Sequence, residues 1–270
     1  MQFGRLRIHW TASRPAPAVA GDLPDSLIHF RCSLCGARGA APSRALAREV
    51  PSCETCGSTV RFRAIGTHLL RALGLGVHAL VDLPPRKDIV GLGLSDWPGY
   101  ARLLAEKFTY ENTYFHKAPQ LNVCAPPPAR RGTCDFLVAS DVFEHVMPPV
   151  SSAFSGAAAL LRPGGVLVLT VPYAPNAATV EHYPGARSYT AGRDGQVWIE
   201  HSAGRFQAPL PVFHGGPGAT LELRVFGSRD LQRELEIAGF EDIVFHAEAD
   251  LEAGILHRDL SSLPITARKR

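Results

Sequence analysis

Between residues 86 and 250, apolar runs of strand length alternate with segments of helical periodicity. The strand-like runs are "DIVGLGL", "CDFLVASD", "GVLVLTVPY" and "EDIVFHAEA", and the helical segments include "VRFRAIGTHLLRALG", "WPGYARLLAEKF", "PVSSAFSGAAALLRPGG" and "SRDLQRELEIAGF", with Ser228 as the expected cap of the last. This alternation indicates a mostly parallel sheet with helices on both faces. Ligands of such sheets bind beyond the carboxyl ends of the strands. The sequence therefore predicts an α/β fold with its site at one edge of the sheet.

A second feature is a pair of Cys-x-x-Cys motifs near the N-terminus. Two such motifs aim four thiolates at one point, and their separation of seventeen residues is typical of a zinc ribbon. Two disulfides are the alternative, but they conflict with the reducing compartment expected below. Four sulfur ligands leave no open position, so we expect a structural Zn²⁺. The expected ligands are Cys32, Cys35, Cys53 and Cys56.

Composition places the chain among ordinary globular proteins. Of 270 residues, 46% are hydrophobic and 20% charged, enough for one large domain or a domain with a small module. The longest apolar runs are far shorter than the ~20 residues that cross a bilayer. The first residues lack the apolar segment of a secretory signal. We expect a cytoplasmic protein that does not enter membranes, with Cys124 and Cys134 as free thiols.

Charge is distributed unevenly along the chain. The net charge is +3, but residues 1–72 hold ten arginines, no lysine and four acidic residues, a net +6, which leaves −3 for the remainder. A basic N-terminal part could dock RNA, phosphate or an acidic partner. Solvated arginines that keep a small module soluble explain the same pattern.

Two stretches resemble class I S-adenosylmethionine-dependent methyltransferases. Residues 134–173, "CDFLVASDVFEHVMPPVSSAFSGAAALLRPGGVLVLTVPY", are similar to the family's fourth strand, helix and fifth strand, and "FGSRDLQRELEIAGFEDIVFH" is similar to its ending. The resemblance covers roughly residues 88–250 and implies a Rossmann-like methyltransferase fold that binds S-adenosylmethionine. "GLGLSDWPGYA", "YENTYFH", "SDVFEHV" and "FHGGPGATLELRVF" further resemble a narrower group of methyltransferase-like proteins with a zinc ribbon.

The family's glycine-rich cofactor loop is reduced in this chain. In one alignment "HALVDLPP" is a remnant of the first strand, "DIVGLGLSD" is the second strand, and the first helix is missing. In the other, "GLGLSD" is itself the cofactor loop, the next helix begins at Trp97, Glu111 lies near the ribose position, and another element is missing. We favour the first alignment. The resemblance implies cofactor contacts from Gly91, Gly93, Ser95, Asp96 and Ser140, although the two glycines could equally serve close strand packing.

The motif "SDVFEH" follows the fourth strand of the resemblance. Asp141, Glu144 and His145 have i, i+3, i+4 spacing, so on a helix start they would share one face. Some family members that methylate catechol-like hydroxyls hold a divalent ion with such a set. Without metal, His145 would serve as general base. The simpler interpretation is that Asp141 caps the helix and the other two hold neighbouring loops.

An insertion at about residues 174–227, which we expect to be β-rich, interrupts the fold where the family often places substrate-recognition segments. The insertion also contains Glu222, and we expect the His and Glu side chains of the insertion to form a lid or a second metal site. Taken alone, "HGGPG" could be only a tight turn. The candidates facing the substrate are His116, Glu181, His182 and His214.

The expected organisation is an N-terminal extension (1–26), a zinc ribbon (27–62), a methyltransferase-like α/β domain (63–250) and a C-terminal tail (251–270). The leading functional hypothesis is a methyltransferase for a small-molecule or sugar-type substrate. The alternatives are a related fold that has lost or replaced the cofactor, and an RNA-modifying or RNA-binding protein that uses the basic ribbon.

Overall fold

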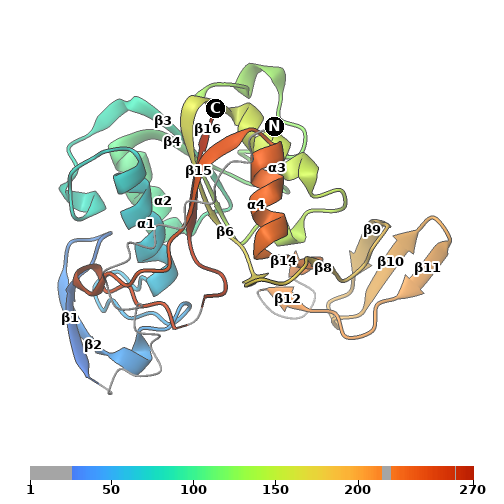
Figure 1. Cartoon of the computed structure of the whole chain (residues 1–270), viewed down its shortest axis with the longest axis horizontal. Helices are drawn as coiled ribbons and strands as arrows, with labels where there is room; N and C mark the ends of the chain where they lie inside the picture. Colours follow the sequence, from blue (N-terminus) through green and yellow to red (C-terminus); the bar gives the residue numbers. More distant parts are fainter. Residues whose placement is uncertain (1–25, 215–219, 259) are drawn as a thin grey trace.

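A computed structural model describes residues 26–214, 220–258 and 260–270, and its centre is a six-stranded sheet (Figure 1). The predicted N-terminal extension and most of "HGGPG" lie outside the described residues. The strand order is β15-β16-β6-β5-β3-β4, in which β3 to β6 are parallel. The strands are β3 (Arg86–Leu94), β4 (Phe108–Thr113), β5 (Cys134–Ser140), β6 (Leu161–Thr170), β15 (Phe240–Phe245) and β16 (Ile265–Lys269). The predicted mainly parallel α/β fold is confirmed.

In the described part of the chain, two helices cover each face of this sheet. They are α1 (Val60–Ala72) and α2 (Pro98–Lys107) on one face, and α3 (Ser151–Leu160) and α4 (Ser228–Ile237) on the other. Side chains alternate along each strand, so Leu137 and Leu167 pack toward α3 and α4 while Phe136 and Val166 pack toward α1 and α2. Ser228 lies inside α4 and does not cap it, because its hydroxyl accepts a bond from Asn176 N at 3.0 Å.

The strand order overturns the alignment that we favoured. β3 pairs with both β4 and β5, the place of the first strand in a doubly wound sheet, where the strand order reverses. "DIVGLGL" is thus the first strand, α2 the first helix and β4 the second strand. Residues 78–85 contain a 3₁₀ turn, η3 (Leu80–Asp82), because Leu80 N and Val81 N bond to carbonyls of the cysteine module. One further strand–helix unit of the doubly wound pattern is missing between β4 and β5.

The C-terminal segment that we expected to be a tail completes the sheet. β16 lies between β15 and β6 and runs antiparallel to both. Its sequence, "ITARK", is short and ends in charged residues, which concealed it. The charges are used structurally, since Arg268 donates to Gly164 O and Ala72 O, and Lys269 donates to Leu161 O.

The cysteine module packs directly on the body. Its hairpin of β1 (Leu27–Arg31) and β2 (Arg38–Pro42) is followed by the 3₁₀ turn η2 (Ser43–Ala45). Phe30 and Leu46 are buried in the same hydrophobic cluster as α1 and the sheet. The fully buried Arg63 of α1 donates to Ser58 O in the module and to Gly254 O near the C-terminus. Module and sheet therefore share one core.

The insertion after β6 is β-rich, as expected, and part of it projects from the body (Figure 1). β9 (Ala186–Ala191), β10 (Val197–His201) and β11 (Gly204–Gln207) form an antiparallel arm. The remaining strands lie at its base: β7 (Tyr173–Ala174), β8 (Val180–Glu181), β12 (Phe213–His214), β13 (Thr220–Leu221) and β14 (Arg224–Gly227). The remaining short turns are η4 (Pro128–Arg130), η5 (Phe143–His145) and η6 (Leu251–Ala253). Among the described residues, every helix is too short or too polar to cross a bilayer.

Candidate functional site

Two arginines, Arg48 of the cysteine module and Arg61 at the start of α1, reach the carboxyl end of β5. Arg48 binds the Asp141 carboxylate through two bonds of 2.7 and 3.0 Å, and Arg61 lies 3.3 Å from the same group. Arg61 also donates to Ser140 Oγ at 2.6 Å. Burial opposes ionisation of Asp141, but the two arginines and a bond from Thr170 outweigh it and lower its pKa to about 2. A dense ion-pair network therefore stands at the edge where such sheets bind ligands.

Asp141 departs from the geometry that its spacing predicts. It follows β5 with φ of +52°, before the 3₁₀ turn that contains Glu144 and His145. Asp141 neither caps a helix nor shares a face with those two residues, because its carboxylate turns toward the arginines. Ser140 and Asp141 nevertheless lie at the strand-order reversal.

The loop after β3 is held by a second polar network. The Asp96 carboxylate is buried and accepts bonds from Tyr100 and Tyr110 at 2.7 and 2.6 Å. Burial raises its pKa to about 7, although both tyrosines favour its charged form. Ser95 N donates to Thr113 O at 2.7 Å, and the Ser95 φ is +59°. The loop is thereby fixed against the end of β4.

Gly91 and Gly93 lie inside β3, before this loop, and adjacent side chains explain them. A Cβ atom on Gly91 would stand 2.0 Å from the Phe136 ring, and one on Gly93 would stand 2.0 Å from the Tyr110 hydroxyl. Only glycine leaves room for these contacts. These contacts account for both glycines by packing, and a cofactor role for them stays a prediction.

Glu144, His145 and His214 come together beside this edge, and His214 arrives from the insertion. Glu144 Oε1 lies 3.6 Å from His145 Nε2 and 3.5 Å from His214 Nδ1. The Glu144 side chain is fully buried, and among the described residues neither of its oxygens has a hydrogen-bond partner. Burial, with the negative charge of Asp141, raises the Glu144 pKa well above its usual value. Burial lowers the pKa of His145, whereas a hydrogen bond to Glu222 raises that of His214.

The insertion is fastened to this loop by a buried arginine. Arg224 is fully buried, binds Glu181 through bonds of 2.6 and 3.1 Å, and donates to Phe143 O and Val146 O at both ends of η5. Leu223 N donates to Glu144 O at 2.9 Å. Glu181, expected to face substrate, instead serves this anchor. The positions of Glu144 and His145 are thus fixed by the insertion.

The contacts of the other predicted candidates differ. His182 shares Glu222 with His214, each at 3.0 Å. His116 is exposed after β4, with its ring against Phe115. Glu111 pairs with Arg130.

The four cysteines of the paired motifs form a compact cluster, with all four sulfurs within 4.8 Å of one another. Cys32 Sγ and Cys56 Sγ are 3.8 Å apart, and Cys35 Sγ and Cys53 Sγ are 3.7 Å apart. Disulfides require about 2.05 Å, whereas tetrahedral Zn–S bonds of about 2.3 Å place sulfurs about 3.8 Å apart. The spacing fits a tetrahedral metal and excludes disulfides in this structure.

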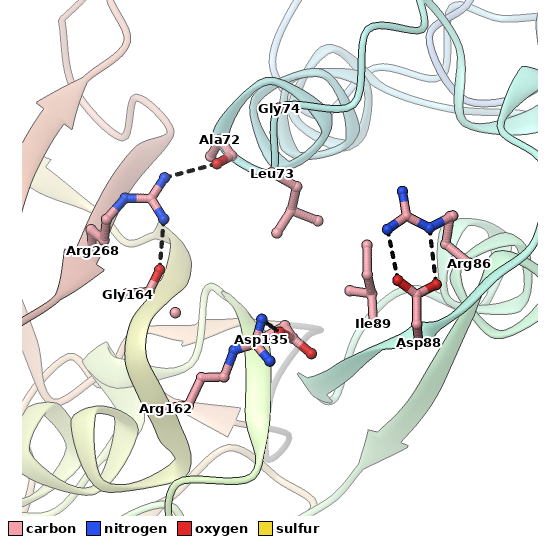
Figure 2. A pocket seen from close by; sticks show the side chains of 11 residues that line it. Ala72, Leu73, Gly74, Arg86, Asp88, Ile89, Asp135, Arg162, Gly164 and Arg268 are labelled. Atoms are coloured by element: carbon pink, nitrogen blue, oxygen red, sulfur yellow. Dashed lines mark hydrogen bonds and ion pairs between the residues drawn. The ribbon is translucent and has the colours of Figure 1, made fainter.

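A cavity of about 600 Å³ opens at the opposite edge of the sheet (Figure 2). Four charged side chains of its lining form ion pairs, Arg86 with Asp88 and Arg162 with Asp135, and Arg268 donates to backbone carbonyls (Figure 2). Because ligands of doubly wound sheets bind at the carboxyl ends of the strands, its size alone does not make it the site.

Sequence reasoning missed Arg48 and Arg61 as parts of the site. The arginine excess of residues 1–72 was the available signal, but no spacing in the sequence indicates that these two side chains reach Asp141. The insertion's histidines were singled out, and the structure shows which of them meets Glu144.

Several solved structures are similar to this chain at low sequence identity. Among solved structures, the CurJ carbon methyltransferase is 16% identical with a TM-score of 0.46, over 78% of this chain and 55% of that one. CalS10, an amino pentose methyltransferase from Micromonospora echinaspora, is 17% identical with a TM-score of 0.41, over 67% and 84%. The chain spans about half the length of the first structures that it matches. Scores this low support no inference about fold or substrate, and no curated protein matches this chain.

A family model also matches the chain. The model described as "Methyltransferase domain" matches residues 67–244, about two thirds of the chain, from α1 to β15. The match includes the strand-order reversal and the loops that carry Asp96, Asp141 and Glu144. The chain belongs to this methyltransferase domain family.

Proposed function

We propose that this protein is an S-adenosylmethionine-dependent methyltransferase for a small-molecule or sugar-type acceptor. The observation that carries the proposal is the strand-order reversal between β3 and β5, with polar loops at Ser95–Asp96 and Ser140–Asp141. Ligands of doubly wound sheets bind at this point. The family of the chain supplies the class of reaction.

The residues at this edge fit the amino-acid end of the cofactor. Its carboxylate suits the guanidinium groups of Arg48 and Arg61, and its ammonium group suits Asp141 or Asp96. Ser140 adds a hydroxyl. When bound, the cofactor supplies a methyl group on a cationic sulfur. Because the glycine-rich loop is reduced, charged side chains would hold the cofactor where other members of the family use backbone amides.

The acceptor would bind beside Asp141, Glu144 and His145, where its proton is lost as the methyl group arrives. The insertion would cover this end, with His182 and His214 toward the acceptor. Its attachment through Arg224 supports this role, because the anchor joins the insertion to η5.

The cysteine cluster would hold a structural Zn²⁺. The same module contributes Arg48 and precedes Arg61, so zinc would fix both arginines at the edge of the sheet. This supports a zinc-ribbon subgroup in which the ribbon completes the site.

The structure weakens the RNA alternative. In the described part of the module, Arg31 pairs with Asp82, Arg48 and Arg61 pair with acidic groups, and Arg63 is buried. The main alternative to the proposal is a related fold that has lost the cofactor, because Arg48 and Arg61 already form ion pairs with Asp141.

Isothermal calorimetry of the zinc-loaded protein with S-adenosylmethionine and S-adenosylhomocysteine tests the proposal. We expect micromolar binding and at least a tenfold loss in Arg61→Met, because a hydrogen bond to a charged group contributes about 1.5–3 kcal/mol. The matched control is Arg86→Met, an exposed arginine with its own acidic partner at the opposite edge. No heat with millimolar ligand would favour a fold that has lost its cofactor, and equal losses in the two variants would place binding elsewhere.

A further inference from the structure

Three metal-ligating atoms from two distant parts of the chain face one another beside η5. They are Glu144 Oε1, His145 Nε2 and His214 Nδ1, and all lie within 4.8 Å of one another. We propose that they form a binding site for a divalent first-row transition metal ion, separate from the cysteine cluster.

The hydrogen bonds of the two histidines aim their free lone pairs at the same point. His145 Nδ1 lies 2.8 Å from Leu221 O, and since a carbonyl only accepts, Nδ1 carries the proton and leaves Nε2 free. His214 Nε2 lies 3.0 Å from a Glu222 oxygen and donates to it, which leaves Nδ1 free. Both free nitrogens point to Glu144 Oε1. Acceptors that converge in this way repel one another unless a cation lies between them.

Glu144 provides independent evidence for a ligand. It is a fully buried carboxylate whose two oxygens have no hydrogen-bond partner among the described residues. Burying such a group without a partner is costly, and buried charges in proteins are paired or bind metals. A metal ion would satisfy the carboxylate where it stands.

The surroundings have the arrangement that supports metal sites. Metal-binding histidines usually donate their other ring N–H to a carboxylate or a backbone carbonyl, which fixes the ring. His214 donates to Glu222 and His145 to Leu221 O. Glu222 is held in turn by His182 at 3.0 Å, so the second layer is itself ordered.

Distances and chemistry indicate the class of ion. Bonds of about 2.0–2.1 Å at tetrahedral angles separate ligand atoms by about 3.3 Å. Two of the separations here are 3.5 and 3.6 Å, so shifts of a few tenths of an ångström would close the site. Two imidazoles and one carboxylate suit Zn²⁺, Mn²⁺, Co²⁺ or Fe²⁺ better than Ca²⁺. Three protein ligands leave further positions open.

This donor set differs from the one that the sequence suggests. The spacing of Asp141, Glu144 and His145 implied a set of three neighbours, but Asp141 is bound by Arg48 and Arg61. The third ligand is His214, from 69 residues further along the chain. Its side chain is 35% exposed, which gives an ion access from solvent. With an ion bound, His145 is a ligand and not a free general base.

The experiment counts metal per chain without cofactor or acceptor. Full-length protein is equilibrated with excess Zn²⁺, freed of unbound ion by gel filtration and analysed by mass spectrometry of the metal. We expect one zinc fewer per chain in His214→Ala and in Glu144→Gln than in the wild type. His29→Ala, an exposed histidine on the hairpin of the module, is the matched control and keeps the wild-type count.

Mn²⁺ gives a second measurement, because thiolate sites do not select it. Electron paramagnetic resonance of protein that carries one zinc per chain, enough for the cysteine cluster alone, should detect one bound Mn²⁺, displaced by added Zn²⁺ and lost in both variants. Circular dichroism confirms that the variants fold. Equal zinc counts in wild type and variants, with equal Mn²⁺ binding, would overturn the proposal. Calorimetry with the cofactor is independent of this result, so the two proposals can fail separately.

Discussion

The link between Asp141 and the two arginines predicts a measurable loss of stability in Asp141→Asn. The Asp141 pKa falls from 3.8 to about 2 in the folded protein. At about 1.36 kcal/mol per pH unit, this corresponds to about 2.4 kcal/mol of stability at neutral pH. The Asp141 side chain is only 16% exposed, so solvent screening reduces this value little. Asparagine tolerates the positive φ, which isolates the loss of charge.

Urea unfolding at pH 7 and pH 5 measures the effect. A carboxylate whose folded pKa is lowered contributes its full stability above the unfolded pKa and loses it as the pH falls through the folded pKa. Both values lie below pH 5, so the cost of Asp141→Asn should be the same at both pH values. A double-mutant cycle with Arg48→Met should give a coupling above about 1 kcal/mol. Asp88→Asn, in an exposed pair, is the control and should cost clearly less than Asp141→Asn.

Three results would refute this reasoning. They are a cost below about 1 kcal/mol at pH 7, a cost that changes strongly between pH 7 and pH 5, and a coupling near zero. Any of them would mean that the module's arginines do not hold the edge of the sheet.

Two further predictions concern packing and pH. Gly91→Ala should lower the free energy of unfolding by about 1–3 kcal/mol, because the new methyl group meets the Phe136 ring. In urea unfolding, the additional substitution Phe136→Leu should recover part of that loss. No recovery would argue for another role of Gly91. Burial, together with Arg71 and His257, lowers the His246 pKa to about 4, so His246 stays neutral when folded and takes up a proton when unfolded. Protonation of His246 in the unfolded chain should therefore lower the free energy of unfolding by about 2 kcal/mol between pH 7.5 and pH 5. His246→Gln should remove this part of the dependence of stability on pH. An unchanged pH dependence in the variant would contradict the assignment.

Much of the sheet could be predicted from local pattern. Runs such as "CDFLVASD" are apolar on both faces because helices cover both faces, and they became buried strands. The strand order was harder to predict. No local sequence pattern indicates that backbone amides in residues 78–85 form hydrogen bonds with the cysteine module, or that β3 lies beside β5. β16 escaped notice because it has only five residues and ends in charged ones, although it lies between β15 and β6.

The candidate site divides in the same way. Glu144 and His145 lie in a motif that could be singled out by residue type and position. Their partner His214, and the arginines that bind Asp141, come from segments far away in the chain. Such contacts depend on how the insertion and the module dock, which is a matter of tertiary packing and not of spacing.

The central claim is that the carboxyl edge at β3 and β5 binds S-adenosylmethionine. Ultraviolet cross-linking with methyl-labelled cofactor, followed by peptide mapping, tests it directly. We predict label in the peptides that contain Ser95–Tyr100 or Ser140–His145, and its loss with excess S-adenosylhomocysteine. Label confined to peptides that line the opposite cavity, or labelling no greater than that of unfolded protein, would contradict it.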